Sequence, residues 1–150
     1  MPINYFLASI ISFLGLLLGI ILIKFAPEEQ KPGKKYFMAF KTIISILVVL
    51  VFIIFSKFNV FAFTGLLVFV LLLFNKKFKN NDALIYLVLG TILALSYKNI
   101  NLFLIESVLI FLYGIPAASL TFNVKKKNYI EVFKKNIWFF IPIIIIYFII

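Results

Sequence analysis

The sequence predicts an all-α, polytopic membrane protein of about six transmembrane helices, with both termini outside. Of the 150 residues, 65% are hydrophobic and only 13% are charged, whereas a soluble domain is about half apolar and about a quarter charged. The apolar residues fall into successive runs, and about 20 apolar helical residues cross a bilayer core of roughly 30 Å. We therefore expect one transmembrane helical domain, residues 1–150, with lipid as its main solvent.

Polar and helix-breaking stretches separate these apolar runs. The expected spans are residues 5–25, 36–55, 60–74, 83–97, 100–124 and 137–150. Each is dominated by Ile, Leu, Val and Phe and carries few charges. Between the first two, Pro27, Pro32 and Gly33 are expected to break the helix and form a turn.

The later connections are marked by turn residues and by helix caps. Residues 56–59 (SKFN) predict a tight turn, and residues 80–82 (NND) offer side chains suited to cap the fourth run. Gly114 and Pro116 interrupt the fifth run. Because the third, fourth and sixth runs are shorter than the usual ~17 to 25 residues, a re-entrant hairpin is the alternative to six complete spans.

The distribution of lysine predicts the orientation. All lysines except Lys57 and Lys98 lie in or beside the first, third and fifth connections. Short lysine-rich loops stay on the cytoplasmic side of a membrane, so these three connections are expected to be cytoplasmic in the cell membrane. Lys41 lies slightly inside the second run, and we expect its side chain to reach back to the headgroups.

The positive charge indicates lipid as a partner. A net charge of +10 would suggest nucleic acid in a soluble protein, but lysines between apolar runs point to anionic headgroups and not to nucleic acid. Tyr129, Ile130, Phe133 and Ile137 recur at helical spacing, which predicts an interfacial helix before the last run. A solvated loop is the alternative. The lysines expected to contact headgroups here are Lys125, Lys126, Lys127, Lys134 and Lys135.

Small residues at four-residue spacing predict close helix packing. Gly15 and Gly19 form a GxxxG pair in the first run, and such pairs let two helices approach closely in a membrane. Gly90 and Gly114 begin similar pairs, each followed four residues later by alanine. These helices are expected to pack on one another within the chain, and a homo-oligomer seam is the alternative.

One acidic residue, Glu106, lies well inside an expected span. Intramembrane carboxylates are costly to bury and are therefore candidates for function. In one interpretation Glu106 lines a polar cavity beside a fifth helix that is broken at Pro116; in the other it forms a structural bridge to Lys57 or Lys98. Pro116 by itself is also explained as a packing kink. The candidate intramembrane polar site consists of Asn101, Glu106, Tyr113 and Pro116.

The residue types that are missing exclude many activities. The chain has no His and no Cys, which removes the commonest metal ligands, the serine–histidine triad and thiol chemistry. Asp82 is its sole Asp, whereas an intramembrane aspartyl protease needs two carboxylates. We therefore predict a protein without catalytic, metal or cofactor site. The expected function is that of a noncatalytic subunit, assembly factor or scaffold that binds a membrane protein; a small transporter or lipid flippase that uses Glu106 is the alternative.

Overall fold

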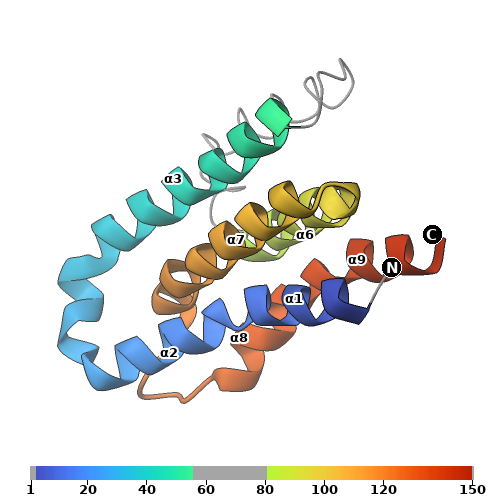
Figure 1. Cartoon of the computed structure of the whole chain (residues 1–150). Coiled ribbons are helices and arrows are strands. Elements are labelled where there is room, and N and C mark those ends of the chain that lie inside the picture. The colour runs from blue at the N-terminus through green and yellow to red at the C-terminus, as the bar shows by residue number, and fades with distance from the viewer. Residues whose placement is uncertain (1–2, 56–80, 150) are drawn as a thin grey trace.

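The computed structural model describes residues 3–55 and 81–149 (Figure 1), and every regular element in these ranges is a helix, which confirms the all-α prediction. The expected third span, residues 60–74, lies outside the described residues. So do the turn at residues 56–59 and the lysines of the third connection, Lys76, Lys77 and Lys79.

The first apolar run forms α1 (Ile3–Phe13) and α2 (Gly15–Phe25), which continue in nearly the same direction (Figure 1). Leu14 joins them, and its N–H lies 3.1 Å from the Ile10 carbonyl oxygen and 3.0 Å from that of Ile11. This shared hydrogen bond tightens one turn without interrupting the continuous path of α1 and α2. Asn4–Phe25 is accordingly long and apolar enough to cross a membrane as one unit.

The connection to the second run is shorter than the sequence predicted. A single 3₁₀ turn, η1 (Pro27–Glu29), leads directly into α3 (Gln30–Phe55). The expectation that Pro32 and Gly33 break the helix is wrong, because both lie in the first turns of α3. The N–H groups of a helix's first turn have no carbonyl partner within the helix, so proline is tolerated there. The stretch Pro27–Phe55 is also long and apolar enough to span.

The fourth and fifth runs form a helical hairpin. α6 (Asp82–Leu95) ends in the 3₁₀ turn η2 (Ser96–Lys98), and α7 (Ile100–Thr121) follows. Pro116 does not break α7, so that part of the prediction is wrong. α7 packs along both α2 and α3, and this packing keeps the helix continuous past the N–H that Pro116 lacks.

The C-terminal segment contains the predicted amphipathic helix, α8 (Tyr129–Asn136), then η3 (Ile137–Phe139) and α9 (Phe140–Ile149). The helix is confirmed, but its most buried residues are Val132 and Asn136, whereas Ile130 is 80% exposed. α9 and η3 pack on α6, and both chain ends lie at one end of the bundle (Figure 1). Ile100–Thr121 is the third stretch suited to span a membrane, and α6 and α9 are shorter.

Small residues form the contact between α2 and α7, as the sequence predicted. A methyl group on Gly15 would overlap the carbonyl oxygen of Phe111, and one on Gly19 would lie 2.9 Å from the Cβ of Ala118. Gly90 lies elsewhere, against the backbone of Phe139 in η3. The prediction that the small-residue helices pack on one another is thus correct for two of them, and α6 uses its glycine against the C-terminal segment.

Candidate functional site

Glu106 is held inside the bundle by the turn that joins α6 to α7. Its side chain is 0% exposed, and its Oε2 is hydrogen-bonded to Ser96 Oγ. Ser96 Oγ also lies 2.8 Å from the carbonyl oxygen of Ile92, which can only accept. A serine hydroxyl carries one hydrogen, and Ser96 shares it between the Glu106 carboxyl and this carbonyl oxygen.

Lys98, one of the two lysines considered as partners for Glu106, does not take this place. The ammonium of Lys98 lies 5.7 Å from the ring centroid of its neighbour Tyr97, and within the described residues Glu106 forms no salt bridge. Lys57 lies outside the described residues. The structure therefore gives Glu106 a hydroxyl partner, Ser96, which the sequence did not single out.

Only part of the predicted polar site comes together. Tyr113 and Pro116 are buried on α7 with Glu106, but Asn101 is exposed. Tyr113 packs edge-on against Tyr86 of α6, with ring centroids 5.1 Å apart. Both tyrosine hydroxyls and Glu106 Oε1 are buried without a hydrogen-bond partner in the described part of the chain. Tyr86 and Tyr113 are in contact between α6 and α7, whereas the contact recorded for Glu106 is with Ser96 in the turn.

A second polar centre ties together three helices, α3, α6 and α8, and sequence reasoning missed it. Lys41 of α3 and Asp82 of α6 form an ion pair, in which the two residues are 5% and 2% exposed. Lys135 of α8 approaches the other carboxylate oxygen at 3.8 Å. Lys41 therefore does not reach the headgroups as predicted. Asp82 is the first residue of α6 and does not cap it, and Asn81 at the cap position makes no side-chain capping bond.

The signal for this ion pair is present in the sequence. Lys41 falls on the same helical face as Ser45, Val48 and Phe52, and all four are buried. A lysine on the apolar face of a helix is costly to bury unless a carboxylate meets it. Asp82 is the chain's sole Asp and begins an apolar run, so it was the natural partner.

No known family model, curated protein or solved structure matches this chain.

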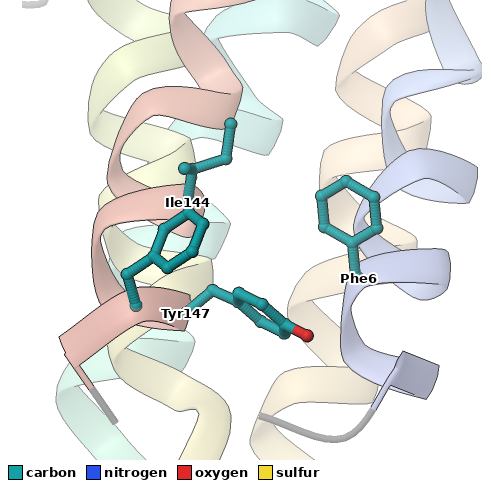
Figure 2. Close-up of a pocket in the computed structure, with 4 residues that line it drawn as sticks. Phe6, Ile144 and Tyr147 are labelled. Atoms are coloured by element: carbon teal, nitrogen blue, oxygen red, sulfur yellow. The ribbon is translucent and has the colours of Figure 1, made fainter.

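The surface between the two chain ends carries an apolar groove. Phe6 of α1 faces Ile144 and Tyr147 of α9 across it (Figure 2), and Phe148 completes the lining in the described part of the chain. The ring centroids of Phe6 and Tyr147 are 6.4 Å apart, and the groove has a volume of about 330 Å³. Its lining is apolar except for the hydroxyl of Tyr147.

A second hollow lies at the opposite end, where the η1 turn meets the C-terminal end of α7. Gln30 crosses between these elements: its Nε2 donates to the carbonyl oxygens of Ser119 at 2.8 Å and Phe122 at 2.6 Å. These are carbonyls that the end of α7 leaves without helical partners. Gln30 thus connects the start of α3 to the end of α7 and satisfies two of the carbonyl oxygens there.

The lysines predicted to contact headgroups are at the surface. Lys125, Lys126 and Lys127 are exposed in a loop where the Asn123 side chain accepts hydrogen bonds from the N–H groups of Lys125 and Lys126. Lys134 and Lys135 are exposed on α8. Among the described residues no group of three potential metal-ligating side chains is found.

Proposed function

We propose that this chain is a noncatalytic, multi-pass subunit, assembly factor or scaffold of the cell membrane, which acts by binding another membrane protein. The observation that carries the proposal is that the serine and threonine hydroxyls of the described residues are used by the helices themselves. In residues 3–55 and 81–149, each Ser and Thr hydroxyl bonds to a carbonyl oxygen of its own helix. Such hydroxyls are not free to line a path for a substrate.

The charged groups in the interior support the same proposal. Lys41 and Asp82 neutralise each other, and one carboxyl oxygen of Glu106, Oε2, is hydrogen-bonded to Ser96. The outward faces of α1, α3, α7 and α9 carry large exposed hydrophobic side chains, which suit lipid or the helices of a partner.

Two contacts also support the six-span topology with lysine-rich cytoplasmic connections. Lys41, Asp82 and Lys135 come from beside the first, third and fifth connections and meet at one place. α2 and α7 run parallel, since Gly15 meets Phe111 and Gly19 meets Ile115. If successive spans alternate in direction, the first, third and fifth connections lie on one side of the membrane. The first and fifth spans, which contain α2 and α7, then run in the same direction.

Site-specific photocrosslinking in native membranes tests the scaffold proposal. A benzoylphenylalanine is placed in turn at pairs of exposed positions one helical turn apart: Leu7 and Ile11, Ile43 and Leu47, Leu104 and Val108, or Ile141 and Ile145. We expect both positions of one pair to form the same protein adduct, identified by mass spectrometry, while the pairs on other faces crosslink only lipid. Lipid adducts alone at all four faces would contradict the proposal.

The alternative, a transporter or lipid flippase, is favoured by one observation: Glu106 Oε1 is buried without a partner among the described residues. It is tested with purified protein in liposomes that contain a fluorescent phosphatidylcholine bleached by external dithionite. For a scaffold, only the outer leaflet bleaches. Bleaching of both leaflets by the wild type, lost on Glu106→Gln, would favour the flippase instead.

A further inference from the structure

An apolar groove beside α8 has features of a lipid site. In the described part of the chain it is lined by Phe13, Tyr129, Ile130, Phe133, Lys134, Ile137 and Phe140, and its volume is about 410 Å³. The Phe13 ring packs with the rings of Phe133 and Phe140, at centroid distances of 5.9 and 4.9 Å. The floor is therefore a set of aromatic rings already fixed by their mutual contacts, and apart from Lys134 its lining is apolar or aromatic.

The two lysines of α8 differ in their surroundings. Lys135 is drawn toward Asp82, at 3.8 Å. Lys134 lines the groove, is exposed and forms no salt bridge within the described residues. The lining of the groove is wholly apolar, so Lys134 borders it with its hydrocarbon stem, and its exposed ammonium is free to meet an anion. This combination matches a ligand with a phosphate at one end and a hydrocarbon chain at the other.

We infer that this groove binds one anionic phospholipid, with an acyl chain on the aromatic floor and the phosphate against Lys134. α8 is amphipathic and leads into the last apolar run, so it lies where headgroups meet hydrocarbon. An anionic phospholipid satisfies both parts of the surface, because one molecule carries the phosphate and the acyl chain. The inference does not depend on the proposed scaffold function.

The sole tryptophan of the chain reports on this groove. Trp138 directly follows Ile137 of the lining and is 49% exposed. The full-length protein is reconstituted in dioleoyl phosphatidylcholine vesicles that contain a small fraction of either phosphatidylglycerol or phosphatidylcholine with brominated acyl chains, which quench tryptophan fluorescence. We expect brominated phosphatidylglycerol to associate about fivefold more strongly, which corresponds to about 1 kcal/mol for one lysine at an anionic headgroup.

Two lysine variants separate a specific site from general surface charge. Lys134→Gln should reduce the preference for phosphatidylglycerol to about that for phosphatidylcholine, because it removes the phosphate partner. Lys34→Gln removes an equal charge from an exposed position on α3 and should leave the preference unchanged. Equal quenching by both lipids, an equal loss in both variants, or no quenching because a protein covers the groove would each overturn the inference.

Discussion

Replacing Gly15 by alanine is expected to lower the free energy of unfolding by about 3 kcal/mol, the upper part of the range for overpacking. The added methyl group would overlap the Phe111 carbonyl oxygen, and backbone atoms cannot rotate away as a side chain can. The reciprocal position is equally tight, since a Cβ on Gly114 would lie 2.6 Å from the carbonyl carbon of Gly15. Gly15→Ile combined with Gly19→Ile should prevent folding altogether. Thermal unfolding in mild detergent measures the effect.

Gly33→Ala is the matched control. Gly33 also lies in a helix, but the nearest atom to an added Cβ is the far edge of the Phe37 ring, at 2.8 Å, and this ring can shift. Alanine favours helix over glycine by about 0.5–1 kcal/mol, so this variant should unfold at the wild-type temperature or slightly above. If Gly15→Ala were as stable as Gly33→Ala, the α2–α7 contact would not be what closes the bundle.

Lys41→Met is expected to destabilise the protein by about 3–5 kcal/mol, because it leaves the Asp82 carboxylate buried without its main partner. Asp82→Leu should cost a similar amount. The double variant should recover most of the loss, since an apolar pair of similar volume can replace a buried ion pair at little cost. Comparing the four proteins in a double-mutant cycle isolates the coupling between the two side chains.

Lys135→Gln provides the comparison for a weak contact. The Lys135 side chain is 47% exposed, and its ammonium is 3.8 Å from Asp82; exposed pairs of this kind contribute about 0–1 kcal/mol. Its unfolding temperature should therefore change little. If the losses of stability in Lys41→Met and Asp82→Leu simply added in the double variant, this would contradict the view that Lys41 and Asp82 hold α3 and α6 together.

The sequence predicted well those features that depend on nearby residues. Apolar runs located most of the described helices. The GxxxG spacing identified Gly15 and Gly19 as a contact face, because residues without large side chains let another helix approach closely. The errors concern the context of a residue. Pro32 and Gly33 were expected to break a helix that in fact begins before them, and Pro116 was expected to interrupt a helix that its neighbours hold together.

The candidate site was harder to predict because its partners are distant in sequence or chemically unremarkable. Lys41 and Asp82 are 41 positions apart, and the pairing depends on how α3 and α6 pack. Glu106 was recognised as an intramembrane carboxyl, but its partner among the described residues is the hydroxyl of Ser96 and not Lys98. A serine ten residues away in a turn carries no charge signal that would mark it as a partner.

In the proposed topology, the η1 turn and the loop after α7 lie on the cytoplasmic side of the membrane, and the α6–α7 turn lies outside. The chain contains no cysteine, so single cysteines can be introduced at the exposed positions Glu28, Lys126 and Lys98 and treated with a membrane-impermeant maleimide. We predict that Lys98→Cys reacts in intact cells, whereas Glu28→Cys and Lys126→Cys react only after permeabilisation. Reaction of Glu28→Cys or Lys126→Cys in intact cells, or protection of Lys98→Cys, would contradict the topology.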